Sequence, residues 1–231
     1  MFYFYDYWYL IFCVPPLILA IFAQFKVKST YKKYSAVMSS SGLDGAGAAR
    51  TVLQYNDVPS LPVQQIAGEL TDNYNPRTQT ISLSQGVYGS HSVAALGIAA
   101  HEAGHAVQYA RGYAPMKIRG MILPMANIGS QAGIWLAILG VILTFRPLAY
   151  VGVGLYLAFV LFELVTLPVE LDASRRAIKA LDGSGILRGE ELAGAKKVLR
   201  AAALTYVAAL ASSIGMLLRL LAIIGGGNRR R

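Results

Sequence analysis

Cysteine and histidine are both scarce in this chain, which has one Cys and three His among its 231 residues. The lone cysteine, Cys13, cannot form an intrachain disulfide, and it cannot supply the several thiolates of a typical structural zinc site. It lies in an apolar stretch, where its ordinary role is that of a small buried residue. Any metal site would therefore have to use histidine and carboxylate side chains.

Charge is scarce as well. Only 14% of the residues are charged, whereas 55% are hydrophobic, and the mean hydropathy is +0.47. This composition excludes an ordinary soluble domain. A helix needs ~20 apolar residues to cross a bilayer, and four stretches approach or exceed that length. They are Trp8–Phe25, Gly120–Phe145, Pro147–Val169 and Val198–Ile224. We expect a mainly α-helical membrane protein with about four transmembrane helices.

Each apolar stretch contains residues that are unusual in a bilayer. In chain order they are Pro15 and Pro16, then Asn127, Ser130 and Gln131, then Glu163, then Arg219. The two prolines should kink the first helix. An intramembrane carboxylate is costly unless it is paired or hydrated, so Glu163 could line a cavity below the site or pair with Arg219. The sequence leaves both readings open.

Basic residues are absent before the first stretch, where Asp6 is the only charge. This pattern is unlike a signal peptide, so we expect a retained anchor. Nine Lys or Arg lie between the first two stretches and six between the last two, with Arg200 at the boundary of the fourth. By the positive-inside rule, the N-terminus is outside and both large loops are cytoplasmic, in a multi-pass protein of the plasma membrane. The basic residues Arg229–Arg231 would then lie on the disfavoured side.

The net charge of +9 could indicate a nucleic-acid partner. The basic residues, however, gather beside the apolar stretches, at 26–33 and at Arg175 and Arg176. Anionic lipid headgroups explain this distribution better, so we expect no nucleic acid. A homo-oligomer or a membrane-protein partner remains open.

Two of the three histidines lie in the motif His101-Glu102-Ala103-Gly104-His105, which has the pattern HExxH. Residues 92–111 contain no proline and are rich in Ala, and a glycine follows, so a helix is predicted. Residues four apart share a helix face, so His101 and His105 can bind one cation while Glu102 reaches a water molecule on it. The motif therefore indicates a catalytic zinc site rather than two core histidines.

Before the motif, the sequence predicts a small α+β region. A short helix is expected from about Asp44 to Tyr55, followed by three short segments with strand character. These segments are Val63–Ile66, Glu69–Tyr74 and Gln79–Leu83. A strand with a free edge could hold an extended substrate backbone, or the hairpin could simply pack on the helix; both remain open. Farther along, Asp182–Gly185 should separate two short helices within 177–201.

A catalytic zinc needs a third protein ligand. The carboxylates after the motif are Glu163, Glu170, Asp172, Asp182, Glu190 and Glu191, and His91 is the only spare imidazole. Glu170 is notable because it lies where the third apolar stretch meets the cytoplasmic face.

Three residues have weaker claims to an auxiliary role. Asp172 should point away from Glu170 on a helix, and a salt bridge to a neighbouring arginine is its ordinary role. His91 could donate a hydrogen bond to an oxyanion, although a surface position is more usual, and Tyr88 is a weaker candidate.

The strings HEAGHAVQ and VELDASRRA, with NYNPRTQTISLSQGVYGSHSVAALGIAAHE before them, resemble the YugP-type family of membrane neutral zinc metallopeptidases. More distantly, the pairing of HExxH with ExxA is similar to the HtpX-like and CAAX-prenyl-protease-like membrane gluzincins. The resemblance implies that His101, His105 and Glu170 bind zinc and that Glu102 is the catalytic acid/base. The distant relatives usually have Asp after ExxA, where this chain has Ser174, so Asp172 or Ser174 would have to substitute for it.

Together these observations predict a membrane-embedded zinc metalloendopeptidase of the HExxH gluzincin type, with one zinc ion per chain. Its substrates would be membrane-associated or cytoplasmic polypeptides, and Glu102 would activate the zinc-bound water. The alternative is a non-proteolytic zinc-binding scaffold, or a latent peptidase that acts through partner binding. The presence of Glu102 favours the enzyme. Cleavage of lipidated or prenylated peptides is implied only by the distant resemblance.

The predicted organisation has five parts around a zincin-like catalytic region with a short β-hairpin or sheet. They are an N-terminal anchor (1–25), a cytoplasmic catalytic region (26–119), a transmembrane hairpin (120–169), a cytoplasmic segment with the third ligand (170–200), and a fourth transmembrane helix with its tail (201–231).

Overall fold

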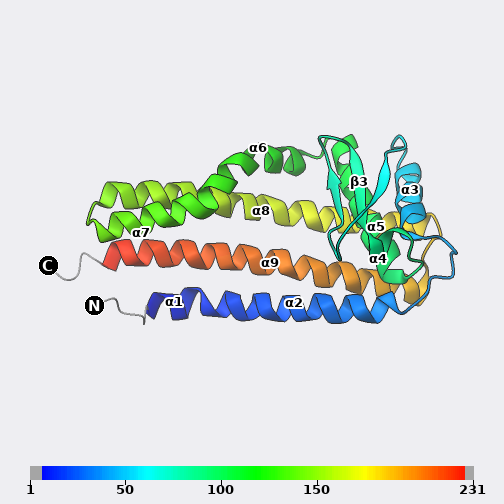
Figure 1. The fold of residues 1–231 in the computed structure, drawn as a ribbon, viewed down its shortest axis with the longest axis horizontal. Helices are drawn as coiled ribbons and strands as arrows, with labels where there is room; N and C mark the ends of the chain where they lie inside the picture. The colour runs from blue at the N-terminus through cyan, green and yellow to red at the C-terminus, as the bar shows by residue number, and fades with distance from the viewer. Residues whose placement is uncertain (1–6, 227–231) are drawn as a thin grey trace. The chain divides into compact units, whose positions relative to one another are not determined.

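The computed structural model describes residues 7–226 and is mainly helical (Figure 1). Asp6 and Arg229–Arg231 lie outside the described residues. The elements, in order, are α1 (Tyr7–Phe12), α2 (Val14–Ser35), α3 (Gly45–Tyr55), β1 (Val63–Ile66), β2 (Asn73–Asn75), β3 (Thr80–Ser84), α4 (Gln85–Tyr88), α5 (Val93–Ala110), α6 (Ala114–Ile128), the π-helix η1 (Gly129–Gly133), α7 (Ile134–Ile142), α8 (Arg146–Gly183) and α9 (Gly189–Gly226). Four helical segments are long and apolar enough to cross a membrane, as the sequence predicts: 7–35, 114–142, 146–183 and 189–225.

The chain forms two compact units. The first comprises Met1–Ala23, Lys117–Leu167 and Thr205–Arg231, and the second comprises Gln24–Met116 and Pro168–Leu204. Helices α2, α6, α8 and α9 each contribute residues to both units. The division of the chain into five parts remains a prediction.

In the first unit, where a kink at the two prolines is predicted, the helix is interrupted at Cys13, between α1 and α2. Pro15 and Pro16 follow immediately, in the first turn of α2. Proline is tolerated there because the first N–H groups of a helix have no partner within the helix. The two prolines therefore start a helix rather than bend its middle.

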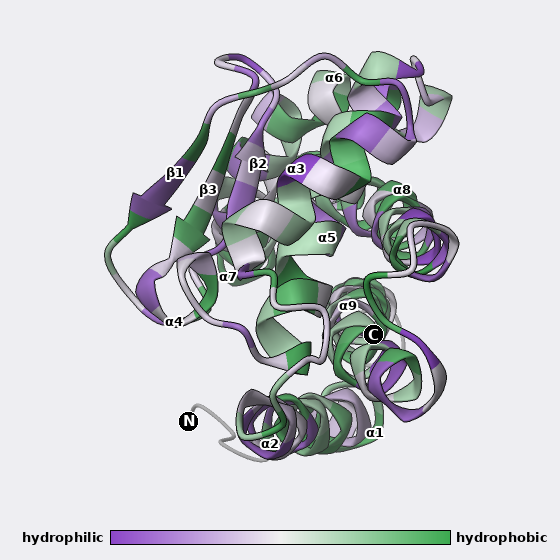
Figure 2. Cartoon of the chain, turned by 90° about the vertical axis from the view of Figure 1, so that its right-hand side faces the viewer, coloured by the Kyte–Doolittle hydropathy of each residue, from purple (hydrophilic) through white to green (hydrophobic). Residues whose placement is uncertain are grey.

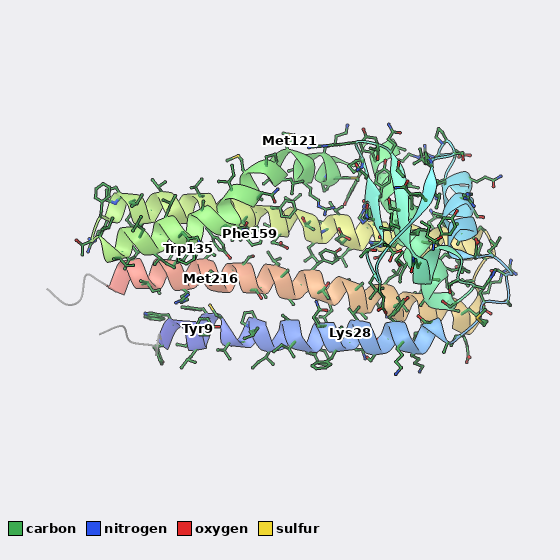
Figure 3. The ribbon with its side chains drawn as sticks, in the orientation of Figure 1. Tyr9, Lys28, Met121, Trp135, Phe159 and Met216 are labelled. Carbon is green, nitrogen blue, oxygen red and sulfur yellow. The ribbon has the colours of Figure 1, made fainter. Side chains whose placement is uncertain are left out.

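Helices α7 and α8 approach each other closely through glycine. A Cβ atom on Gly152 of α8 would overlap the backbone nitrogen of Ala137 on α7. The adjoining core contains Ala137, Ala149, Val153, Tyr156, Val160, Leu220 and Ile224, with Phe159 and Met216 packed against it (Figure 3). Small residues thus let the backbones of the two helices pack directly against each other, in a region with few polar side chains that could form hydrogen bonds between helices.

Large apolar side chains cover the outside of the first unit. Met121 and Trp135, both labelled in Figure 3, are 76% and 72% exposed. Exposed apolar surface on this scale is expected where lipid, rather than water, surrounds the helices.

In the second unit, Asp44 caps α3 by accepting a hydrogen bond from the Gly47 N–H, as the predicted helix start requires. The sheet has the order β1-β3-β2, with β1 parallel and β2 antiparallel to β3 (Figure 2). The hairpin prediction is therefore right for β2 and β3. The second strand in the sequence, β2, is shorter than the predicted segment Glu69–Tyr74, because it covers only Asn73–Asn75.

The core of the second unit surrounds α5. Its buried residues include Leu53 of α3, Leu83 of β3, Leu96 of α5, Leu181 of α8 and Leu199 of α9. The break between α8 and α9 lies where the glycine-rich turn predicts it. The prediction of two short helices there is wrong, because both are parts of 38-residue helices that continue from the apolar stretches.

The glycine contact between α7 and α8 gives a direct test. We expect Gly152→Ala to destabilise the protein by about 1–3 kcal/mol, because the new methyl group would overlap backbone atoms. Gly154 lies two positions farther on the same helix, and a Cβ atom added there would have nothing within 4 Å. Gly154→Ala is therefore the matched control, and it should be neutral or stabilising by up to ~1 kcal/mol. Thermal unfolding of the detergent-solubilised variants measures both, and equal unfolding temperatures would contradict the packing argument.

Candidate metal centre

Helix α5 carries all three polar residues of the HExxH motif. It is capped at its start by Ser92, whose side chain accepts a hydrogen bond from the Ala95 N–H at 3.2 Å. At its end, Gly112 has φ +64°, a conformation that glycine adopts without strain. The caps hold a helix on which His101 and His105 are one turn apart, with ring centroids separated by 4.7 Å.

The third group comes from α8. One carboxylate oxygen of Glu170, Oε2, lies 3.2 Å from Nε2 of His101 and 3.3 Å from Nε2 of His105. Glu170 is 3% exposed, so this carboxylate is removed from water and faces both imidazoles. Residues 69 positions apart in the chain thus meet at one point.

This set of donors fits a zinc ion. Among the described residues, the group of potential metal ligands contains His101, His105 and Glu170, with donor atoms within 4.8 Å of one another. Two imidazoles and one carboxylate are a common ligand set of catalytic zinc sites, in which a fourth position stays open. A structural site would need a fourth protein ligand, and the group found among the described residues has three.

Gly104 permits the close approach of α5 and α8. A Cβ atom at this position would lie 2.6 Å from the backbone oxygen of Ala173 on α8. Any side chain would therefore push α8 away, and Glu170 lies less than one turn from Ala173 on that helix. The lack of a side chain at Gly104 sets the distance between the ligands.

Glu102 lies in the buried part of the site and is 8% exposed. Burial raises the pKa of its carboxyl group, against the opposing charges of His101 and His105, and the carboxylates of Glu170 and Asp72 raise it further. A carboxyl group with a raised pKa holds a proton more readily than one in water. That property suits a group that must take up and release a proton.

Asp72 is a residue that sequence reasoning missed. It accepts hydrogen bonds from the backbone N–H of Ser84 at 2.8 Å and from the Ser84 hydroxyl at 3.0 Å. These hydrogen bonds connect the residue before β2 with the last residue of β3. Burial raises the pKa of the Asp72 carboxyl group. Nothing in the sequence around it marks this role.

The outer nitrogen of each imidazole also has a partner. Nδ1 of His101 lies 3.1 Å from the Ser174 hydroxyl, and Nδ1 of His105 lies 3.0 Å from Oε1 of Gln108. Such contacts orient metal-binding histidines so that the other nitrogen faces the metal. Ser174 is one of the two residues that the sequence suggests for such a supporting role. The sequence analysis did not identify Gln108, although its spacing of three from His105 puts both residues on one helix face.

Asp172 makes the predicted ion pairs. Its Oδ2 atom lies 2.6 Å from Nε of Arg176, and its Oδ1 atom lies 3.6 Å from Nη1 of Arg175. It also accepts a hydrogen bond from Nε2 of Gln108 at 3.0 Å. Asp172 is therefore connected to the imidazole of His105 through one side chain.

The remaining auxiliary candidates are not among the residues that the structure brings together at the metal-ligand group. His91 is exposed before α5, where its carbonyl oxygen accepts a hydrogen bond from the Ser39 N–H. Tyr88 packs against the core of the second unit. Glu163 belongs to the first unit, in which the guanidinium of Arg219 lies 5.3 Å from the centre of the Tyr9 ring.

Among the described residues, β1 and β2 are the edge strands of the sheet, where a substrate strand could pair. β3, which leads towards α5, is the central strand and is paired on both sides, so it cannot accept another strand. β2 is an edge strand. Its Tyr74 ring lies 6.1 Å from the ring of Tyr109, which follows His105 by four positions on α5.

Comparison with known proteins shows the family of the chain. Residues 9–225 match the model of a family described as "Putative neutral zinc metallopeptidase". The chain belongs to this family. It is also similar to the "Putative membrane protease YugP" of Bacillus subtilis (strain 168), with 42% identity over 214 residues, covering 93% of this chain and 95% of that protein. No solved structure matches the chain.

Membership of the zinc metallopeptidase family confirms the predicted resemblance and implies a zinc ion. The matched region includes the complete His101, His105 and Glu170 group.

The spacing at Gly104 can be tested by metal binding. We expect Gly104→Ala to weaken zinc binding at least tenfold, because the methyl group would displace the backbone of α8 and Glu170 with it. Gly97→Ala is the control on the same helix, since its nearest neighbour would be a side-chain atom, Cβ of Ala195, at 3.3 Å. Zinc content after dialysis against a graded chelator measures both, and full zinc binding by Gly104→Ala would contradict the close-approach argument.

Proposed function

We propose that this chain is a membrane-embedded zinc metalloendopeptidase of the HExxH gluzincin type, with one zinc ion per chain. The observation that carries the proposal is the convergence of His101, His105 and Glu170 beside the buried carboxyl group of Glu102. The family description supports it independently.

The chemistry divides between the metal and one side chain. A zinc ion in such a site polarises the scissile carbonyl group and makes a water molecule more acidic. Glu102 accepts the proton of the attacking water and returns it to the leaving amine. His101, His105 and Glu170 hold the ion and have no part in proton transfer.

The substrates are polypeptides that are associated with the membrane or lie in the cytoplasm near it. Free backbone groups on β2 can pair with an extended peptide, and Tyr74 on this strand lies against Tyr109 of the ligand-bearing helix. This location favours β2 over β1 as the substrate-binding edge.

The protein is proposed to lie in the plasma membrane with its catalytic region on the cytoplasmic side. The second unit contains most of the basic residues that follow the apolar stretches, including Lys26, Lys28, Lys32 and Lys33. Such residues favour the cytoplasmic face and anionic headgroups.

Substitution of the proposed base separates catalysis from metal binding. We expect Glu102→Gln to bind zinc like the unmodified chain but to lose at least ~99% of peptidase activity, since the amide cannot accept the proton. His105→Ala should lose both zinc and activity. Zinc content and the new peptide termini in membranes that contain each form are the measurements.

The same comparison distinguishes the alternative functions. An active Glu102→Gln protein would refute the assignment of the base. Zinc binding by the unmodified chain without any new termini would instead favour the scaffold or the latent peptidase.

Reporter fusions test the orientation. A reporter that is active only outside the cytoplasm should be active after Phe145 and after Arg231, and inactive in the turn at Gly185. An inactive reporter at both of the first two points would place them in the cytoplasm and contradict the four-span arrangement. If the reporter is active at only one of the two points, the result shows which span fails to cross.

A further inference from the structure

Gln108 is fully buried, and the proposed catalytic chemistry does not use it. Its side-chain amide makes three hydrogen-bond contacts. Oε1 lies 3.0 Å from Nδ1 of His105, and Nε2 donates to the backbone oxygen of Val169 at 2.8 Å and to Oδ2 of Asp172 at 3.0 Å. A buried amide with this many contacts is held in one orientation.

The chemistry of its partners fixes which end of the amide faces the histidine. A backbone carbonyl oxygen and a carboxylate can only accept hydrogen bonds, so the NH₂ group must face Val169 and Asp172. The carbonyl end of Gln108 then faces Nδ1 of His105, which must carry a proton to make the contact. Nε2 of His105 is the nitrogen left for Glu170 and a metal ion.

Asp172 is itself held by an arginine, which donates to the same carboxylate oxygen as Gln108. Nε of Arg176 donates to Oδ2 at 2.6 Å, and the Arg176 guanidinium lies 5.6 Å from the centre of the Tyr113 ring. Arg175 makes only a longer contact, at 3.6 Å, and its side chain is 76% exposed. A solvent-exposed pair of this kind contributes little.

We propose that Gln108 and Asp172 are positioning residues for the metal ligand His105. The chain of contacts from His105 through Gln108 and Asp172 to Arg176 selects the imidazole nitrogen that faces the metal and limits rotation of the ring. The inference rests on the proposed zinc site and assigns a task to the glutamine of the HEAGHAVQ string.

The two imidazoles are therefore held differently. The outer nitrogen of His101 meets the Ser174 hydroxyl, which can either donate or accept a hydrogen bond and so does not select one tautomer. His105 meets an acceptor whose orientation is fixed by a charged network. Loss of the Gln108 contact should consequently weaken metal binding more than loss of the Ser174 contact.

Gln108→Met tests this inference, because methionine has nearly the same size as glutamine but cannot form these hydrogen bonds. The zinc dissociation constant is measured by chelator competition on the full chain in detergent, with Glu102→Gln in every protein so that proteolysis does not interfere. We expect about 10- to 100-fold weaker zinc binding for Gln108→Met and a smaller loss for Ser174→Ala.

A charge exchange tests the connection between Gln108 and Asp172. Gln108→Glu alone should weaken zinc binding, because it brings two carboxylates together. Adding Asp172→Asn should recover at least part of the affinity, since the new amide can donate to the carboxylate at position 108 while that carboxylate accepts from His105. A packing role alone predicts no such recovery.

Matched arginine variants provide the control for the end of the network. Arg176→Ala should weaken zinc binding several-fold, whereas Arg175→Ala, which removes the exposed partner of the same carboxylate, should not. The unfolding temperature of the zinc-free proteins is measured in parallel. Unchanged zinc affinity in folded Gln108→Met, or no recovery in the exchange pair, would overturn the inference.

Glu170→Ala separates failure of this inference from failure of the proposed function. If Glu170→Ala binds zinc as well as the unmodified chain, the proposed metal centre is wrong. If Glu170→Ala loses zinc while Gln108→Met keeps full affinity, the metal centre stands and only the positioning role fails.

Discussion

The close approach of α5 and α8 is the constraint on which the candidate site depends. α5 supplies two imidazoles from successive turns, but the carboxylate that meets them comes from another helix. That carboxylate reaches Nε2 of both histidines only because Gly104 presents no side chain to the backbone of Ala173. Glycine is unfavourable within a helix by about 1 kcal/mol relative to alanine, and here that cost is offset by a contact no other residue permits.

A second constraint follows from the burial of so many polar groups beside an alanine-rich helix. In a medium of low polarity, an unpaired donor or acceptor is expensive, so each polar group at the site needs a partner. Glu170 pairs with the imidazoles, while Gln108 and Ser174 pair with their outer nitrogens. The candidate metal ligands and the residues that orient them therefore form one connected set.

The sequence predicted much of the fold because its strongest signals are local. Apolar stretches of sufficient length indicate spanning helices, and the Ser92 cap and Gly112 mark the ends of α5. The hairpin of β2 and β3 was also predictable from its turn. The full length of α8 and α9 was not predictable, because polar residues that follow an apolar stretch resemble a loop. Packing in the second unit keeps these residues helical.

Contacts between distant segments were harder to predict. HExxH spacing identifies two candidate ligands. The third, Glu170, could be located only approximately from the sequence, at the end of an apolar stretch. Gln108 lies in the right place on α5, yet its bonds to Val169 and Asp172 depend on how α8 packs. Asp72 has no sequence signal at all, because its role depends on the sheet register that brings it to Ser84.

The 69 positions between His101 and Glu170 also set an order of events during synthesis. The chain is made from its N-terminus, so both imidazoles exist before the second and third apolar stretches and before the carboxylate that joins them. A partly made chain has an incomplete ligand set and cannot yet hold a metal as the finished site does. In the proposed enzyme, activity would therefore begin only after α8 has been made and packed.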